Sequence, residues 1–193
     1  MLDTKTFNLE NNNTVLMEGK MVRSKQMAVV AVLLAIGAVL RAITPPVALI
    51  TPNFVIAMYC LAILLIRPNL GGALGIGFVG GAVAMIFSKS PIPYLNLISE
   101  PAGALVCALI VSYLPEFSMK NYSFKPILAA GIGTLVSGTL YITLNFKFAL
   151  ALPPDQMTVM WNAAFITVVL PVTAINAVLA QILYAPAKKL LRI

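Results

Sequence analysis

The sequence contains no histidine and few charged residues. Histidine is the commonest metal ligand and acid–base side chain, and charged residues make up only 10% of the 193 positions, against about 25% in soluble domains. The sequence also lacks a GxxxxGK[ST] phosphate loop, an HExxH motif and a CxxC motif. These absences argue against an ATPase and a metal- or nucleophile-dependent enzyme, so we expect no catalytic residue, no cofactor and no metal site.

Apolar residues dominate the chain instead, at 60% of all positions. About 20 apolar residues cross a membrane as a helix, and the apolar runs predict an all-α membrane protein, a single domain over residues 26–193 with six transmembrane helices. We expect these helices at 26–43, 53–66, 70–87, 97–114, 126–146 and 158–185. The second is short, so either it tilts into the preceding segment or residues 46–52 form an irregular stretch inside the bundle.

The distribution of lysine and arginine predicts the orientation. Residues 1–25 are polar, and we interpret them as a flexible cytoplasmic leader. With both termini inside, ten of the 13 Lys and Arg residues fall in cytoplasmic segments and three, Arg41, Lys89 and Lys147, fall outside. This asymmetry predicts cytoplasmic N- and C-termini in a multi-pass protein of a bacterial cell membrane. Because the cations lie at the ends of apolar runs, we expect contact with membrane lipid and no nucleic-acid partner.

A polar segment beside the fourth helix is the first candidate binding site. Residues 89–101 face outside in this topology and contain Tyr94, Asn96 and Glu100. An aromatic face, an amide and a carboxylate suit a small amphipathic solute. The alternative is an ordinary interfacial loop that Tyr94 anchors at the headgroups.

Asn145, Trp161 and Asn176 are further candidates for substrate contacts, near the outer ends or the interior of the last two helices. Asn176 follows Pro171 within an apolar helix, and a buried amide needs hydrogen-bond partners. It either contacts a ligand or satisfies a structural kink at the proline.

The predicted first helix carries Ala31 and Ala35 on one strip. Small residues at four-residue spacing allow helix backbones to approach closely in a membrane. This strip either binds a partner helix or packs within the bundle.

Several segments together resemble a known family. They are Ala31–Ala38, Pro45-Pro46, Pro52-Asn53, Leu64–Pro68, Ile92–Pro101, and Val168–Pro171 with Asn176 and Tyr184. On these segments the chain resembles the substrate-binding S component of an energy-coupling-factor (ECF) transporter, within the tryptophan-transport (TrpP-like) family.

The resemblance implies a membrane-embedded binding protein that captures tryptophan from outside. It also implies docking, through Ala31 and Ala35, on the ECF T transmembrane subunit, which carries two ATPase subunits. The chain has Thr51-Pro52-Asn53 where the family has Lys-Pro-Asp, and Ser99-Glu100 where it has Asp-Lys. Because these positions suit an amino acid's charged groups, we expect Asn53 to contact the substrate, which is tryptophan or a related small ring compound.

Other classes of protein stay open on the sequence. A self-contained, ion-coupled secondary transporter of a small amphipathic solute is one alternative, although such carriers keep ionisable groups deep in their helices. An S component for a vitamin-like substrate is a second alternative. A membrane enzyme or assembly factor is a third, disfavoured by the missing catalytic motifs. Transport without any ATPase partner would identify the ion-coupled carrier.

Overall fold

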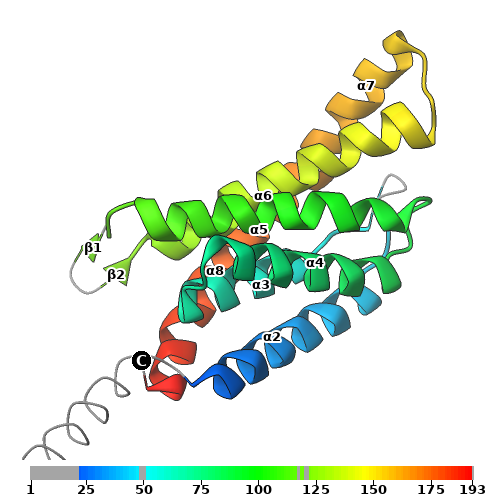
Figure 1. Cartoon of the computed structure of the whole chain (residues 1–193). Coiled ribbons are helices and arrows are strands. Elements are labelled where there is room, and N and C mark those ends of the chain that lie inside the picture. The colour runs from blue at the N-terminus through cyan, green and yellow to red at the C-terminus, as the bar shows by residue number, and fades with distance from the viewer. Residues whose placement is uncertain (1–21, 48–50, 117, 120–121, 193) are drawn as a thin grey trace, which may run out of the picture.

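The chain folds into a bundle of membrane-spanning helices, as predicted (Figure 1). The computed structural model describes residues 22–47, 51–116, 118–119 and 122–192, so nearly all of the expected leader lies outside the described residues. The helices are α2 (Arg23–Ile43), α3 (Val55–Ile66), α4 (Leu70–Ile86), α5 (Asn96–Tyr113), α6 (Lys125–Leu144), α7 (Pro154–Ala164) and α8 (Leu170–Leu191). The last two join through η3 (Phe165–Val169) into one continuous helix, which makes six helical bodies in the described part of the chain.

Helix α3 forms the centre of the bundle although it is too short to span a membrane. Its 12 residues measure about 18 Å, against a hydrocarbon core of about 30 Å. All of them except the last are buried. The irregular residues Thr51–Asn53 lead into it and are buried as well, so the structure agrees with the irregular alternative for this part of the 46–52 segment.

Hydrogen bonds from neighbouring elements satisfy this irregular backbone. The Thr51 amide donates to Ser90 Oγ at 2.9 Å, and the Asn53 carbonyl accepts from Asn176 Nδ2 at 3.0 Å. Non-helical backbone is tolerated at membrane depth only where protein or water covers it in this way. The short helix α3 and the segment before it therefore depend on the helices around them.

Small residues allow α4, α5 and α6 to approach closely. A Cβ atom added at Gly77 would lie 2.7 Å from the Pro101 Cα of α5, and one added at Gly133 would lie 3.1 Å from the Gly103 carbonyl oxygen. The small residues of α4 do not all serve this purpose, because a Cβ atom at Gly75 would meet nothing within 4 Å.

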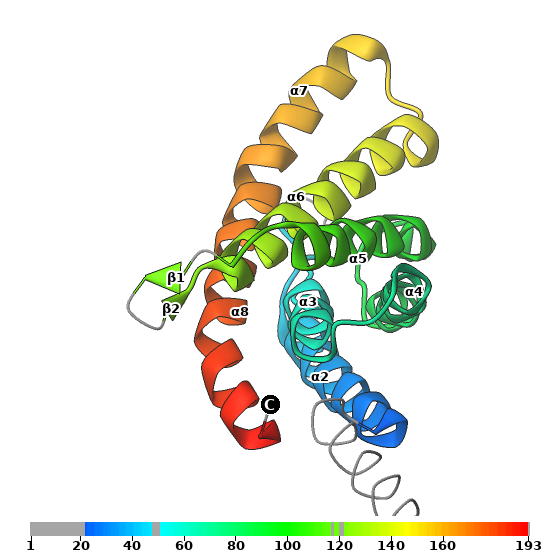
Figure 2. The ribbon, with the colours of Figure 1, turned by 60° about the vertical axis from the view of Figure 1, so that its left-hand side comes forward.

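The last helix is longer than predicted and projects from the bundle together with the end of α6 (Figures 1 and 2). Residues Pro154–Leu191 form 38 residues of continuous helix, about 57 Å long. The sequence predicts a start at residue 158 because Asp155 and Gln156 are polar. The helix continues through Pro171. A proline removes one intrahelical hydrogen bond, and the π-helical segment η3 directly before it accommodates that loss.

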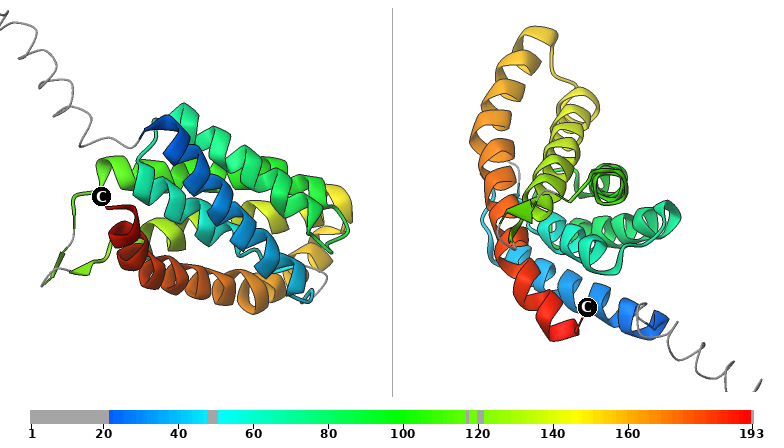
Figure 3. Two further views of the ribbon diagram at one scale, coloured as in Figure 1. Left: turned by 90° about the horizontal axis from the view of Figure 1, so that it is seen from below. Right: turned by 90° about the vertical axis from the view of Figure 1, so that its left-hand side faces the viewer.

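The two ends of the described chain meet at one end of the bundle (Figure 3). Lys25 Nζ donates to the Leu191 carbonyl at 2.7 Å. The same end of the bundle has an ion-pair cluster between the ends of α3, α5 and α6, in which Glu116 lies 2.8 Å from Arg67 and 3.5 Å from Lys125. Slight burial raises the pKa of Glu116, but the hydrogen bond from Ser123 and the two cations outweigh it and lower the pKa below its usual value. Both ends of the described chain thus lie at the same end of the bundle.

Candidate functional site

A cavity lies inside the bundle, in the half away from the chain ends. The space between its lining atoms is about 410 Å³ including the part that opens to solvent, and only about 40 Å³ of it is wide enough to hold water. The lining residues come from every helical body except α4, and from the irregular segment before α3. They are Arg41, Thr51, Pro52, Asn53, Ile56, Asn96, Glu100, Thr134, Ser137, Gly138, Tyr141, Ile142, Val168, Val169 and Val172.

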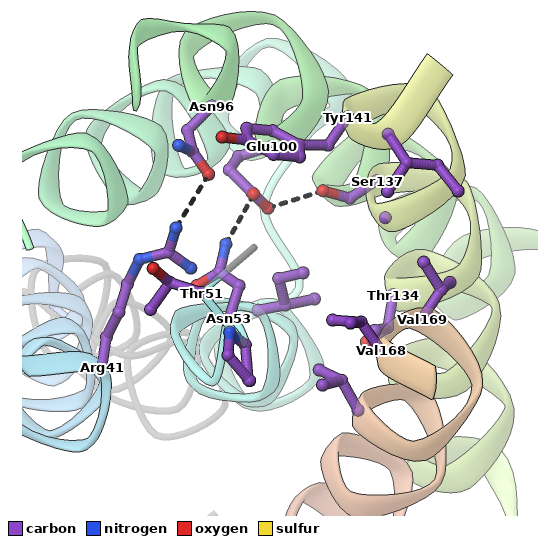
Figure 4. Close-up of a pocket in the computed structure, with 15 residues that line it drawn as sticks. Arg41, Thr51, Asn53, Asn96, Glu100, Thr134, Ser137, Tyr141, Val168 and Val169 are labelled. Atoms are coloured by element: carbon purple, nitrogen blue, oxygen red, sulfur yellow. Dashed lines mark hydrogen bonds between the residues drawn. The ribbon is translucent and has the colours of Figure 1, made fainter. Parts of the chain in front are cut away.

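One wall of the cavity is polar, and Glu100 of α5 lies at the centre of this polar wall (Figure 4). Its Oε1 accepts a hydrogen bond from Asn53 Nδ2 at 2.6 Å. Its Oε2 accepts from Tyr59 at 3.0 Å and from Ser137 at 2.9 Å. These donors belong to α5's neighbours α3 and α6 and to the segment before α3, so Glu100 links three parts of the chain while one edge of the carboxylate borders the cavity.

Arg41 provides the second charge of the polar wall. Its place after an apolar run predicts a cation at the outer surface, but the side chain turns inward and is only 1% exposed. Nη2 donates to Asn96 Oδ1 at 3.4 Å, a long bond, and Asn96 Nδ2 in turn donates to the Pro93 carbonyl. Among the described residues, Nε and Nη1 of Arg41 have no hydrogen-bond partner.

The opposite wall of the cavity is apolar. Val168, Val169 and Val172 cover it, at the point where η3 passes into α8. Figure 4 shows Val168 and Val169 across the space from Arg41. A cavity with charged groups at one wall and valine side chains at the other suits a small solute that has a charged head and an apolar body.

Four of the seven predicted substrate contacts belong to this region. Asn53, Asn96 and Glu100 line the cavity. Asn176 is fully buried directly behind it, where Nδ2 donates to the Asn53 carbonyl and to Thr134 Oγ1 at 3.2 Å. Asn176 therefore positions cavity residues from behind. This contact pattern is closer to a structural role than to direct contact with a ligand.

The other three predicted contacts lie away from the cavity. Tyr94 is 59% exposed. Trp161 stacks on Phe165 with ring centroids 5.0 Å apart and donates its indole N–H to Thr143. Asn145 is buried, and its side-chain amide has no partner among the described residues. Their roles in binding stay predictions that this cavity does not support.

Sequence reasoning missed Arg41, Tyr59 and Ser137. Ser137 belongs to a small-residue pattern in α6, and Tyr59 lies in an apolar run, so neither carries a signal for a polar cluster. A basic residue at a predicted helix end, one turn before a double proline, was the available signal for Arg41. Ala31 and Ala35, the predicted partner-binding residues, are exposed on α2.

Comparisons with known proteins agree on one family. The family model described as "Tryptophan transporter TrpP" matches residues 23–192. A "Probable tryptophan transport protein" of Clostridium acetobutylicum is 31% identical, covering 88% of this chain and 95% of that protein. Proteins with the same name from Clostridium perfringens and Bacillus subtilis are 29% and 27% identical, each covering 88% of this chain and 94% of the relative. No solved structure gives a significant match.

Proposed function

Because the chain belongs to the tryptophan transporter family TrpP, we propose that it takes up tryptophan, or a closely related ring compound, through the cavity inside the bundle. It is a multi-pass bacterial membrane protein with four helices long and apolar enough to cross the membrane. The observation that carries the proposal is the cavity's pairing of Arg41 and Glu100 with a valine wall. Tryptophan has the matching halves, a zwitterionic head and an apolar ring.

We propose further that the chain is the S component of an ECF importer, with ATP hydrolysis supplied by a T transmembrane subunit and two ATPase subunits. The absence of a phosphate loop from the sequence supports this division of labour. The exposure of Ala31 and Ala35 on α2 also supports it, because small side chains let a partner helix approach closely.

The position of the cavity supports capture from outside. Arg41 lies in the last turn of α2, Asn96 in the first turn of α5, and Tyr141 near the end of α6. All of these are far from the end where Lys25 meets Leu191. With cytoplasmic termini, the cavity lies in the outer half of the membrane.

The cavity in this structure is small for a whole tryptophan molecule. Binding therefore requires its walls to move apart. The irregular residues Thr51–Asn53 lack helical hydrogen bonding, and we propose that they are the part of the wall that moves.

Titration calorimetry on the purified full chain in detergent tests the substrate. We expect L-tryptophan to bind without ATP or an ion gradient, and riboflavin, biotin and small polar amino acids to give no heat of binding. A well-folded protein that ignores L-tryptophan would contradict the proposed substrate.

Uptake into vesicles tests the mechanism separately. We expect labelled tryptophan to accumulate only when the T subunit, both ATPase subunits and ATP are present with the chain. Accumulation driven by a proton or sodium gradient with the chain alone would identify an ion-coupled carrier instead.

A further inference from the structure

The Arg41 guanidinium is a buried cation whose hydrogen-bonding groups are mostly unused. Only Nη2 has a partner, at 3.4 Å, and Nε and Nη1 have none among the described residues. The ion pairs found in the described chain all involve Glu116, at the other end of the bundle. A buried charge without direct partners is costly, and in membranes such groups usually serve function.

Glu100 does not supply the missing contacts. Its oxygens accept hydrogen bonds from Asn53, Tyr59 and Ser137, and it makes no ion pair with Arg41 within 4.0 Å in the described chain. A carboxylate has about four lone-pair sites, so one site stays available. Glu100 thus reduces the cost of burying Arg41 through space, but it leaves Nε and Nη1 of this cavity-lining residue without a hydrogen-bond partner among the described residues.

We propose that the Arg41 guanidinium binds the carboxylate of the substrate, which makes Arg41 the residue that selects solutes with a free carboxylate. The inference rests on the proposed function and specifies how its site recognises the substrate. A planar guanidinium offers two edges to a carboxylate, Nε with Nη2 and Nη1 with Nη2. Asn96 takes one of the two Nη2 hydrogens, so one edge keeps both of its N–H groups and can bind a carboxylate through two parallel hydrogen bonds. Asn96 fixes the guanidinium through its own bond to the Pro93 carbonyl.

The same placement assigns the rest of an α-amino acid. With the carboxylate on Arg41, the ammonium group lies toward the free lone-pair site of Glu100, since both residues border the cavity. The side chain then extends toward Val168, Val169 and Val172, on the far wall (Figure 4). The cavity therefore recognises an amino acid with a large apolar side chain at three places: Arg41, Glu100 and the valine wall.

A ligand series tests the inference on the wild-type chain. L-tryptophan carries both charges, tryptamine lacks the carboxylate, and indole-3-propionate lacks the ammonium group. We expect tryptamine to bind on the order of a hundredfold or more weaker than L-tryptophan, because it leaves the buried guanidinium without a partner. Indole-3-propionate retains the carboxylate contact and should still depend on Arg41.

Arg41→Gln and Arg41→Lys, with Lys147→Gln as control, connect this preference to the residue. Lys147 is an exposed cation outside the cavity. We expect Arg41→Gln to weaken L-tryptophan binding on the order of a hundredfold while changing tryptamine binding little. Arg41→Lys keeps the charge without the fork and should lose part of the affinity. Lys147→Gln should bind like the wild type.

The outcomes separate the inference from the proposed function. If L-tryptophan binds Arg41→Gln within about threefold of the wild type, or if both ligands weaken equally in the milder Arg41→Lys variant, Arg41 only supports the wall and the inference is wrong. The proposed function survives either result. Failure of folded wild-type protein to bind L-tryptophan would overturn both.

Discussion

The Glu100 carboxylate is held by three donors that converge on it from different parts of the chain. Each donor is buried, so none can turn to water if its acceptor disappears. A buried donor left unpaired costs about 1–3 kcal/mol. Glu100 thus fixes the shape of the polar wall as well as its charge.

Glu100→Gln should therefore weaken tryptophan binding by about tenfold to a hundredfold. Glutamine replaces one accepting oxygen with an N–H donor, which opposes Asn53 or Tyr59 and removes the negative charge that would face the substrate's ammonium group. Titration calorimetry gives the affinity. Glu116→Gln is the matched control, since Glu116 is 45% exposed at the opposite end of the bundle, and unchanged affinity in a folded Glu100→Gln variant would remove Glu100 from the site.

Individual site residues were predictable only where they stood out from their surroundings. Glu100 is a lone carboxylate beside an apolar run, and Asn96 is an amide in the polar segment 89–101, so the residue pattern singled out both. Asn53 became a candidate only through the family resemblance. Arg41 follows an apolar run in the same way as a loop cation. Its inward direction depends on Asn96, 55 positions away, which pattern analysis of a single sequence does not relate to it.

Among the elements, α4 and α5 illustrate how a missing side chain places the site. Gly77 faces the α5 backbone, and a Cβ atom there would lie 2.6 Å from Ala104 Cβ and 3.1 Å from the Glu100 carbonyl oxygen. The first turns of α5 carry Asn96 and Glu100. The distance between the two helices therefore determines where the polar wall lies.

Gly77→Ala should destabilise the protein by about 1–3 kcal/mol, the usual cost of overpacking, and weaken tryptophan binding by moving α5. Gly75→Ala is the control on the same helix, because its new methyl group meets nothing within 4 Å, and we expect no loss of stability. The thermal midpoints of the purified proteins measure the difference. Equal midpoints for the two variants would show that α4 and α5 can separate freely.

The helices themselves were largely predictable because apolar runs of this length have few alternatives to a membrane helix. Starts and ends of the first five helices agree within a few residues with those expected from the sequence. The sixth was wrong at both ends, since Asp155 at its outer end and Pro186 at its inner end suggest breaks that the helix Pro154–Leu191 does not make. Tertiary context, not local pattern, decided its length.

At the scale of the whole molecule, the bundle is asymmetric along the membrane normal. The chain ends and the Arg67–Glu116–Lys125 cluster occupy one end. The cavity lies toward the other end, and the α6–α7 arm projects there (Figures 1 and 3). Among the described residues, only Lys89 and Lys147 are exposed lysine or arginine residues at the cavity end, because Arg41 is buried there. Seven lie toward the other end: Arg23, Lys25, Arg67, Lys125, Lys188, Lys189 and Arg192. The charge asymmetry that predicts cytoplasmic termini is thus sharper than the sequence alone suggests.

Cysteine labelling in intact cells tests this orientation, on which capture from outside depends. The native Cys60 and Cys107 are buried and should react little, so the unmodified chain serves as background. We expect Gln156→Cys, exposed at the start of α7, to react with a membrane-impermeant maleimide in intact cells, and Lys188→Cys, exposed near the end of α8, to react only after permeabilisation. The reverse pattern would open the cavity toward the cytoplasm. A binding site there could not collect tryptophan from the medium, and the uptake function would have to be abandoned even if the purified protein bound tryptophan tightly.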